Sequence, residues 1–530
     1  MKFPNITSAR YRKIGLAALA GMLSIFIFPS YNVELLAWIV FIPLFAAIQQ
    51  ENLKNTFWLG WGAGVIHFLG TLYWVTVAMT VYGGIHPILS GVFLLLMSMY
   101  LALYMGLFCL ILRYGQQQTV LPLIVSAPVV WVGLEYVRSF FFLAFPWNFL
   151  GYSQFLTPSV TQIADITGVY GVSFLVMLVN AGLYTCIFSK VSRGIKITTA
   201  VATVCCVGCC MGYSLWRLPS EQVAKTGNTP STEASQTVKV AVVQGNIPQN
   251  LKWDPKHRQE IFATYIRLSK RTLDKHPDLI VWPETAVPFV FQYEPDYSKQ
   301  LIRAVREFGI DLLFGGQDII LRPPPKHYDS FNSAFLLSSE GRLLSKYDKI
   351  QLVPFGEYIP FKKILFFVDK LTTAIGEVLP GETYQVMPFH DKPLSTVICF
   401  EIIFPDLVRK FVGRGARFLV TISNDAWYNK TAAPYQLFAM ATFRAIENRV
   451  AIARAANTGI SGFVDPYGRI LAQSEIFVED AFVRDIPVGT TTTWYTRYGD
   501  VFARLCLMLL VLGIGYGVYK RRFARKLQRK

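Results

Sequence analysis

Cys399 and Glu401 interrupt an apolar run, STVICFEIIFP at residues 395–405, that otherwise has the pattern of a buried strand. Two other charged residues lie beside apolar segments in the same way: Glu284 ends LIVWPE, and Lys349 precedes LVPF. Burying such residues is costly unless they are paired. We therefore expect the fold to bring a thiol, a carboxylate and an ammonium group together at strand ends.

These three groups suit acyl transfer. A carboxylate within hydrogen-bond reach can take the thiol proton and return it to a leaving group, and a lysine that stays cationic can stabilise an oxyanion. A helix predicted at residues 405–413, PDLVRKFVG, would further favour the thiolate. A papain-type Cys/His/Asn site is the weaker alternative, because none of the six histidines lies in such a pattern.

Cys399 is the only cysteine between residues 220 and 495. The alternative role for a lone cysteine is to fill space in the apolar core. Glu284 and Lys349, which also lie beside apolar segments, favour a chemical role instead. The other seven all fall in apolar segments: Cys109, Cys186, Cys205, Cys206, Cys209, Cys210 and Cys506. CCVGCC at 205–210 has no His or carboxylate neighbours, so it indicates helix packing. No metal and no cofactor is predicted.

The composition indicates a membrane protein. Of 530 residues, 53% are hydrophobic and 16% charged, and windows long enough to cross a bilayer occupy the first 220 residues and the last 30 or so. We predict eight spans, within residues 15–28, 34–48, 57–79, 88–112, 120–137, 166–188, 197–216 and 501–520.

Basic residues flanking spans stay in the cytoplasm. With eight spans they all fall on one side: Lys2, Arg10, Arg12, Lys13, Lys54, Arg113, Lys190, Arg193, Lys196 and the tail KRRFARKLQRK. Both termini are thus predicted to be cytoplasmic, with residues 217–495 outside. This topology accounts for part of the net charge of +17, so a nucleic-acid partner is not expected.

We divide the chain into four parts: a seven-span bundle (1–218), a Ser/Thr/Pro-rich linker (219–237), a globular domain (238–495) and a last span with a basic tail (496–530). In the globular part, apolar strand patterns such as VKVAVVQGN, DLIVWPET and RFLVTISND alternate with helical patterns such as YSKQLIRAVREFG. This alternation predicts an α/β layer fold with covered sheets.

The chain resembles a known family. Glu284 in VWPETAVP, Lys349 in YDKIQLVPFGEYIP and Cys399 in VICFEIIFP resemble the Glu-Lys-Cys triad of the carbon–nitrogen hydrolase (nitrilase) superfamily, whose fold is an α-β-β-α sandwich. With the multispan bundle, the C-terminal span, VVQGNIPQNLKWDP, FPWNFLGYSQ, SNDAWY and RAANTGIS, nearly the whole chain is similar to the apolipoprotein N-acyltransferase family of bacterial envelopes.

The resemblance implies a two-step reaction. Cys399, deprotonated by Glu284, would take an acyl chain from a membrane phospholipid as a thioester, with Lys349 stabilising the intermediate. The N-terminal amine of a diacylglyceryl-cysteine apolipoprotein would then accept the chain, in the last step of lipoprotein maturation. The expected location is the bacterial inner membrane with a periplasmic catalytic domain. The expected oligomeric state is a monomer.

The resemblance also implies substrate-binding residues, namely Trp253, Phe355, Glu357, Phe400, Glu401 and Trp147. Two positions depart from the pattern of many relatives, which have tyrosine at Phe400 and histidine at Leu437. In the bundle, Glu135 and Arg138 are functional candidates because ionisable groups are rare at membrane depth, although they could simply pair with each other.

Two other functions are open from the sequence. A membrane-tethered amidase or nitrile hydrolase would use the same triad and pass the acyl group to water, but a small soluble substrate needs no eight-span anchor. A membrane scaffold carrying an inactive hydrolase domain would not need Cys399.

Overall fold

The computed structural model describes residues 8–118, 121–219, 237–323, 328–359, 378–489 and 491–527. The chain forms two compact units. The first is Met1–Thr76, Pro87–Arg217 and Asp500–Lys530, and the second is Val77–His86 with Leu218–Gly499. The end of the third predicted span, together with the residues that lead to the fourth, therefore belongs to the second unit. Most of the predicted linker, residues 220–236, lies outside the described residues.

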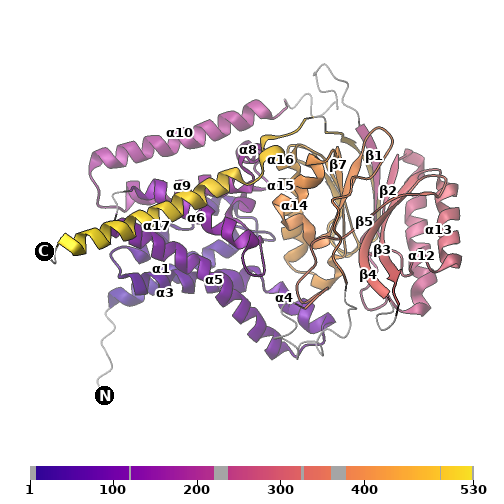
Figure 1. Cartoon of the computed structure of the whole chain (residues 1–530), viewed down its shortest axis with the longest axis horizontal. Coiled ribbons are helices and arrows are strands. Elements are labelled where there is room, and N and C mark those ends of the chain that lie inside the picture. Colours follow the sequence, from indigo (N-terminus) through magenta and orange to yellow (C-terminus); the bar gives the residue numbers. More distant parts are fainter. Residues whose placement is uncertain are drawn as a thin grey trace. The chain divides into compact units, whose positions relative to one another are not determined.

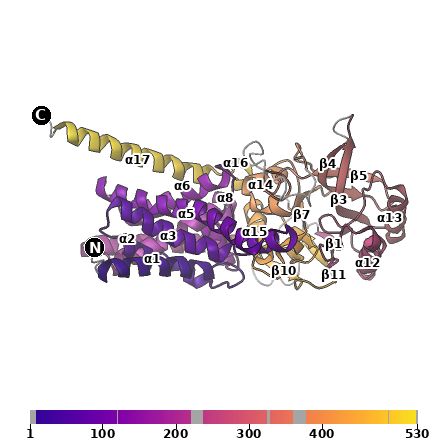
Figure 2. The ribbon, with the colours of Figure 1, turned by 90° about the horizontal axis from the view of Figure 1, so that it is seen from below.

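The first unit is helical (Figures 1 and 2). Its main helices are α1 (Ser8–Phe26), α2 (Ile42–Ile48), α3 (Leu53–Thr71), α5 (Pro87–Gln118), α6 (Leu123–Phe140), α9 (Val169–Ile187), α10 (Arg193–Arg217) and α17 (Val501–Leu527). Its shorter helical segments are η1 (Glu34–Trp38), η3 (Leu150–Gln154), α7 (Pro158–Thr161) and α8 (Ala164–Thr167), and α4 (Trp74–Val77) reaches its boundary. Helix α3 packs on α1 and α5, and α6 packs on α9 and α17.

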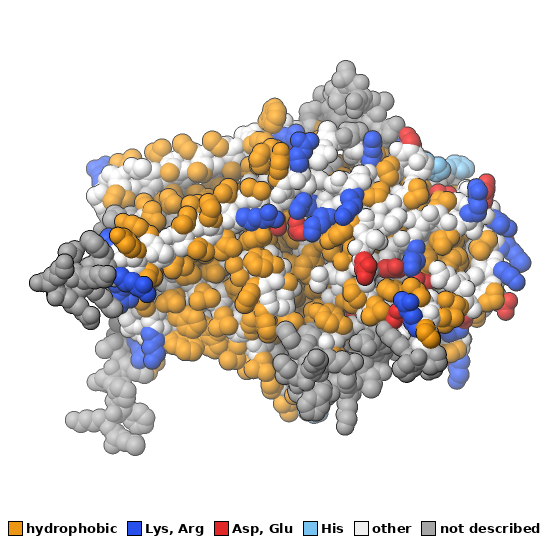
Figure 3. All heavy atoms as spheres, viewed as in Figure 1, with side chains coloured by type: hydrophobic (Ala, Val, Ile, Leu, Met, Phe, Trp, Pro, Cys, Tyr) orange, Lys and Arg blue, Asp and Glu red, His pale blue; other side chains and the backbone are white. Residues whose placement is uncertain are grey.

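Large apolar side chains cover the outside of these helices (Figure 3). Leu96 on α5, Val204 on α10 and Leu512 on α17 are 54%, 70% and 60% exposed. Exposing such a large apolar surface to water is unfavourable, whereas lipid chains solvate it. The first unit therefore has the character of a membrane domain.

Eight spans are predicted from the sequence, but fewer of the described helices are long and apolar enough to cross a membrane. Among the described residues, five helices meet these two criteria, or six if α3 is counted together with the bent segment Trp74–Tyr82. Helix α1 does not meet them, and Glu34–Ile48 is apolar but short. The count of eight, and the orientation derived from it, stay predictions.

The second unit contains two sheets (Figure 1). One has the order β11-β1-β2-β3-β4-β5 and the other β10-β9-β8-β7-β6. The strands of the first are β1 (Thr237–Gln244), β2 (Leu279–Val281), β3 (Asp311–Leu321), β4 (Tyr328–Leu337), β5 (Leu343–Asp348) and β11 (Asp480–Pro487). Those of the second are β6 (Leu394–Ile398), β7 (Phe418–Ser423), β8 (Ile452–Ala456), β9 (Gly462–Val464) and β10 (Ile470–Gln473). The predicted α/β alternation is confirmed.

Helices lie beside each sheet. In Figure 1, α12 (Arg258–Lys270) and α13 (Pro295–Phe308) flank the first sheet, and α14 (Pro405–Gly413) and α15 (Ala433–Asn448) flank the second. The amphipathic face of α13 packs on β2, β3 and β4 in a core that also holds Trp282. The two sheets meet where the backbone N–H of Asn246, after β1, donates to the carbonyl oxygen of Asn457, after β8, at 2.8 Å.

The strand pattern in STVICFEIIFP, residues 395–405, is a wrong prediction after its first residues. Strand β6 ends at Ile398, and Cys399–Ile403 forms a short 3-10 helix, η7. The strand ends there because Cys399 adopts a positive φ of 53° and the Glu401 carboxylate accepts the backbone N–H of Ile398 at 2.8 Å. The strand pattern misled the sequence analysis because η7 is as fully buried as the strand before it.

Gly315 on β3 lets the chain after β2 approach closely. A Cβ at this position would lie 2.6 Å from both Glu284 Cα and Thr285 N, which are backbone atoms. The next residue, Gly316, faces side chains instead, with Val287 Cγ2 at 3.1 Å.

We expect Gly315→Ala to lower the stability of the second unit by about 1–3 kcal/mol, the usual cost of overpacking. Gly316→Ala is the matched control and should lower the stability less, because the Val287 side chain that it would meet can shift whereas backbone atoms cannot. Thermal unfolding of the full-length protein in detergent, followed by circular dichroism, compares the two. Equal melting temperatures for the two variants would contradict the expectation.

Candidate active site

The three candidate residues follow strands that end near one another. Glu284 comes just after β2, Cys399 directly after β6 and Lys349 directly after β5. Strand β5 runs in the same direction as β3 and β2, because β3 and β5 are both antiparallel to β4 and β2 is parallel to β3. Their carboxyl ends therefore lie at one edge of the sheet, which is where ligand sites form in α/β folds.

Glu284 is buried and held by two hydrogen bonds. Its Oε1 accepts from Asn332 Nδ2 at 2.7 Å, and its Oε2 accepts from the backbone N–H of Asn424 at 2.8 Å. Asn332 comes from β4 in the first sheet, whereas Asn424 follows β7 in the second. The carboxylate is thus oriented by both sheets.

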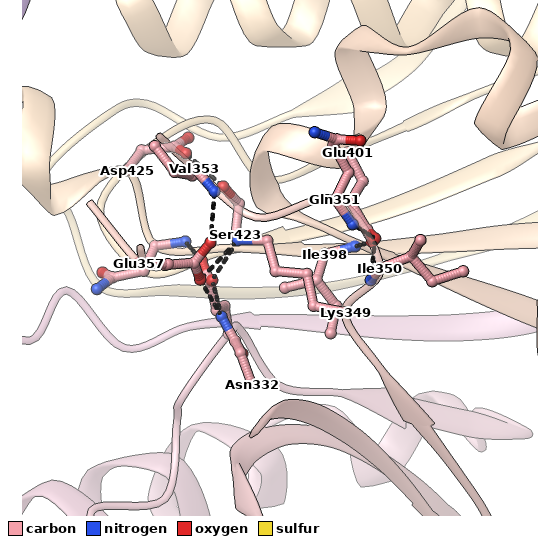
Figure 4. Close-up of polar contacts among 12 residues, drawn as sticks. Asn332, Lys349, Ile350, Gln351, Val353, Glu357, Ile398, Glu401, Ser423 and Asp425 are labelled. Atoms are coloured by element: carbon pink, nitrogen blue, oxygen red, sulfur yellow. Dashed lines mark hydrogen bonds and ion pairs between the residues drawn. The ribbon is translucent and has the colours of Figure 1, made fainter. Parts of the chain in front are cut away.

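Lys349 is 1% exposed and lies between two carboxylates (Figure 4). Its Nζ is 2.9 Å from Glu357 Oε1 and 3.6 Å from Glu284 Oε1. Burial by itself would lower the pKa of Lys349, but the charges of Glu357 and Glu284 outweigh burial and raise it. Lys349 therefore stays cationic, which suits an oxyanion partner and excludes a base.

Glu357 completes this cluster. Its Oε1 also accepts from Asn332 Nδ2 at 3.0 Å, and its Oε2 accepts from the backbone N–H of Val353 at 2.8 Å. One amide group therefore joins the two carboxylates that flank Lys349. Glu357 contacts the predicted triad directly, and its predicted contact with substrate stays a prediction.

Cys399 lies in a strained turn and is 5% exposed. Burial raises the pKa of the thiol, the Glu284 charge raises it further, and Lys349 acts in the opposite direction. The resting group is therefore a neutral thiol. The predicted helix is present as α14, from Pro405 to Gly413, and its effect on the thiolate stays a prediction. A base must take the proton as the sulfur attacks, and Glu284, whose charge acts on the thiol, is suited to that task.

Backbone strain is concentrated around these residues. Cys399, Thr285 and Phe355 all have positive φ, at 53°, 46° and 61°. For non-glycine residues such conformations cost about 1–3 kcal/mol each and persist only where the surroundings enforce them. Thr285 follows Glu284 directly, so two of the three positions adjoin or belong to the predicted triad.

Glu401 holds the backbone near the triad. It is fully buried, and its Oε1 accepts from the Tyr347 hydroxyl at 2.7 Å and from the backbone N–H groups of Ile350 and Gln351 at 2.7 and 3.0 Å. Figure 4 shows this carboxylate against the chain that follows Lys349. The contacts indicate a positioning residue, and its predicted contact with substrate stays a prediction.

The other predicted substrate-binding residues of the second unit lie in different surroundings. Trp253 and Phe355 are each 45% exposed, which leaves their rings free to meet an apolar ligand. Phe400 is 4% exposed and packs edge-to-face on Phe404 at 5.3 Å, as a core residue does.

Trp147, Glu135 and Arg138 belong to the first unit. Trp147 is buried, with Trp74 at 4.7 Å and Phe145 at 5.6 Å between ring centroids. Glu135 accepts from Trp131 Nε1 at 2.9 Å, and the Arg138 guanidinium lies 4.9 Å from the Phe149 ring centroid. Glu135 and Arg138 line one cavity of the bundle, and no ion pair between them is found among the described residues.

Three polar residues of the site escaped the sequence analysis: Asn332, Asn424 and Lys252. Asn424 lies in SNDAWY at the end of a predicted strand, and Lys252 precedes Trp253 in LKWDP. Both belong to motifs that carry the family resemblance, which was a weak indication that they belong to the site. Asn332 sits within FNSAFLL and is recognisable only from its contacts.

Comparison with known proteins shows the family of the chain. The model for the apolipoprotein N-acyltransferase N-terminal domain matches residues 20–182, and the carbon-nitrogen hydrolase model matches residues 239–496. An apolipoprotein N-acyltransferase from Geobacter metallireducens is 39% identical over 96% of this chain and 95% of its own length. The chain belongs to the apolipoprotein N-acyltransferase family.

Further members of the family match over the same span. The enzyme from Pasteurella multocida is 29% identical over 97% of each chain, and that from Chlorobaculum tepidum is 30% identical over 96% of this chain and 97% of its own. Among solved structures, an amidase from Nesterenkonia sp. aligns with 52% of this chain and 97% of its own at 21% identity and a TM-score of 0.37. Family membership and the carbon-nitrogen hydrolase match show that the protein is an acyltransferase with a nitrilase-like domain.

The opposing effects of Glu284 and Lys349 on Cys399 can be measured. Glu284→Gln removes a negative charge, so the thiol should ionise at lower pH, and Lys349→Met removes a positive charge, so it should ionise at higher pH. The pH dependence of iodoacetamide labelling at Cys399, followed by peptide mass spectrometry, reports both shifts. Shifts of the same sign in the two variants would contradict the assignment.

Glu401 offers a second test. Glu401→Gln places an amide N–H₂ group where backbone N–H groups already donate, which should lower the free energy of unfolding by about 1–3 kcal/mol. As a positioning residue it should lower the melting temperature and kcat while KM changes little. Normal stability together with a raised KM would instead indicate that Glu401 contacts substrate.

Proposed function

We propose that this protein transfers an acyl chain from a membrane phospholipid, through a thioester on Cys399, to the free N-terminal amine of diacylglyceryl-cysteine on apolipoproteins, the last step of bacterial lipoprotein maturation. The observation that carries the proposal is the buried cluster of Glu284, Lys349 and Glu357 beside a neutral thiol in a strained turn. Family membership supports the same reaction class.

In the first half-reaction, Glu284 takes the proton from Sγ while the sulfur attacks the ester carbonyl of the phospholipid. Lys349, kept cationic by its two carboxylates, stabilises the oxyanion of the tetrahedral intermediate. Glu284 then gives the proton to the departing lysophospholipid oxygen. The thioester retains the acyl chain, and Glu284 is again a carboxylate.

In the second half-reaction, the acceptor amine attacks the thioester carbonyl. Glu284 takes a proton from the attacking nitrogen and returns it to sulfur, which regenerates Cys399 as a thiol. The exposed rings of Trp253 and Phe355 are proposed to contact the acyl chains, and Glu357 and Glu401 to hold the triad in place. Roles for Phe400 and Trp147 in substrate binding are proposed on the family resemblance alone.

The proposed location is the bacterial inner membrane, with eight spans, a periplasmic catalytic domain, cytoplasmic termini and a monomeric state. Support comes from the basic residues flanking the spans and from the position of the domain in the sequence, where α10 precedes it and α17 follows it. An acyltransferase whose two substrates are held in one leaflet gains from such tethering, because it keeps the reacting groups close. The α-β-β-α layer order is proposed from the two sheets and their flanking helices.

Labelled acyl transfer tests the proposal. Incubating the full-length protein with phosphatidylethanolamine carrying a labelled acyl chain should add one acyl mass to Cys399, and adding a diacylglyceryl-cysteine peptide should move the label to the peptide. Cys399→Ala should abolish both steps, and Glu284→Gln should slow the first by about 10²-fold or more. The melting temperature of Cys399→Ala should stay near the wild-type value. That of Glu284→Gln should fall, because its amide would stand where Asn332 Nδ2 and the backbone N–H of Asn424 already donate.

The same experiment separates the alternative hydrolase. An enzyme that forms no thioester from phospholipid but releases ammonia from amides would contradict the transferase proposal. Transfer that continues in Cys399→Ala would indicate a different nucleophile and would equally contradict it.

A further inference from the structure

A second lysine lies in the active site and takes no part in the scheme above. Lys252 sits in the turn that follows β1 and is 1% exposed. Its Nζ donates to the backbone carbonyl oxygen of Glu284 at 3.0 Å. The charged groups that act on it are Glu284, after β2, and Cys399, after β6. Lys252 therefore faces the same reacting groups as Lys349.

The surroundings of the two lysines differ. Lys349 has carboxylate oxygens at 2.9 and 3.6 Å, whereas the one bond of Lys252 is to a carbonyl oxygen. Among the residues that the structure describes, Lys252 has no ion pair, and the carboxylate of its neighbour Asp254 accepts the backbone N–H of Lys256 instead. A buried ammonium group without a paired carboxylate loses its proton readily.

The pKa of Lys252 agrees with this geometry. Burial lowers it to about 7, although the charge of Glu284 acts in the opposite direction. Below that pH the side chain is an ammonium group, and above it a free amine. The site therefore holds one permanent cation, Lys349, and one lysine that exchanges a proton near neutral pH.

The proposed reaction has an unassigned proton. The acceptor is a primary α-amine with an ordinary pKa of about 7.7–8.0, so at pH 7 only about one molecule in ten is uncharged. An α-ammonium must lose one proton before it can attack and a second as the amide forms. Glu284 carries only the second, because a single carboxylate holds one proton at a time.

We propose that Lys252 is a further catalytic residue, which as a free amine takes the first proton from the α-ammonium of the acceptor. This inference rests on the proposed function. One N–H bond of the acceptor breaks, one forms at Lys252 Nζ, and the electron pair left on the α-nitrogen attacks the thioester carbon. The C–S bond then breaks, Glu284 carries the second proton from nitrogen to Sγ, and Lys252 releases the first proton to solvent.

The two half-reactions are measured separately in Lys252→Met and Lys252→Arg. Arginine keeps a donor for the Glu284 carbonyl but cannot lose its proton at neutral pH, so it separates a base from a structural lysine. Full-length proteins in detergent first receive phosphatidylethanolamine with a labelled acyl chain, and thioester on Cys399 is measured. The acyl-enzyme is then mixed with a diacylglyceryl-cysteine peptide at pH 6.5 to 9. Lys256→Met, which removes an exposed lysine four residues along, is the matched control.

Both Lys252 variants should form the thioester. Both should transfer the acyl chain to the peptide about tenfold more slowly than wild type at pH 7, because without a base only the roughly one acceptor molecule in ten that is uncharged can attack. The deficit should shrink towards pH 9, where the acceptor is already uncharged. It should also vanish when hydroxylamine, which is uncharged at pH 7, replaces the peptide. Lys256→Met should match wild type throughout.

Four results would overturn the inference. Rescue by Lys252→Arg, or equal deficits in both half-reactions, would make Lys252 a structural support for the Glu284 backbone. A deficit that persists at pH 9 would exclude its role as the base. Loss of thioester formation in both variants would mean that the fold or the acylation step needs Lys252. If wild type itself forms no thioester, the proposed function fails, which is a different and separately visible outcome.

Discussion

The buried positive charge of Lys349 depends on two carboxylates, and much of the site serves to hold them. Without Glu357 at 2.9 Å and Glu284 at 3.6 Å, burial would drive the proton off the lysine. Asn332 bridges both carboxylates, and the backbone N–H of Asn424 fixes the second oxygen of Glu284. Because these groups come from both sheets, the charge state of one side chain depends on how the sheets meet.

The same burial that is costly for charge makes the thiol a poor acid. Cys399 rests protonated, so its reactivity must come from a neighbouring base and from the geometry of a strained turn, not from a standing thiolate. A neutral thiol is also less prone to oxidation than a thiolate. Lys252 extends this pattern, since burial without a paired carboxylate gives it the opposite character to Lys349.

The two units follow different solvation rules. In the first, apolar side chains point outward on α5, α10 and α17, as lipid requires, while polar groups such as Glu135 are buried inside. In the second, many of the buried charged groups lie at strand ends or in close pairs such as Arg454 with Asp425 at 2.9 Å. Residues 77–86 belong to the second unit although they connect two bundle helices, and there Tyr82 packs edge-to-face on Trp427. The loop that carries Asn424 is thus contacted by a segment that comes from the membrane part of the sequence.

Hydrophobic patterns along the sequence were enough to predict the membrane helices α5, α6, α9, α10 and α17, the alternating strands and helices, and the charged residues at strand ends, because each pattern reflects local periodicity and burial. Family motifs added the pairing of Glu284, Lys349 and Cys399. Only the tertiary structure decided that Cys399 begins a 3-10 helix, that Glu401 binds backbone N–H groups, and that Asn332 and Lys252 belong to the site. The site depends on contacts between residues that are far apart in the sequence, such as Asn424 with Glu284, which are 140 positions apart. It also depends on pKa values that burial and nearby charges set together. No local pattern encodes either.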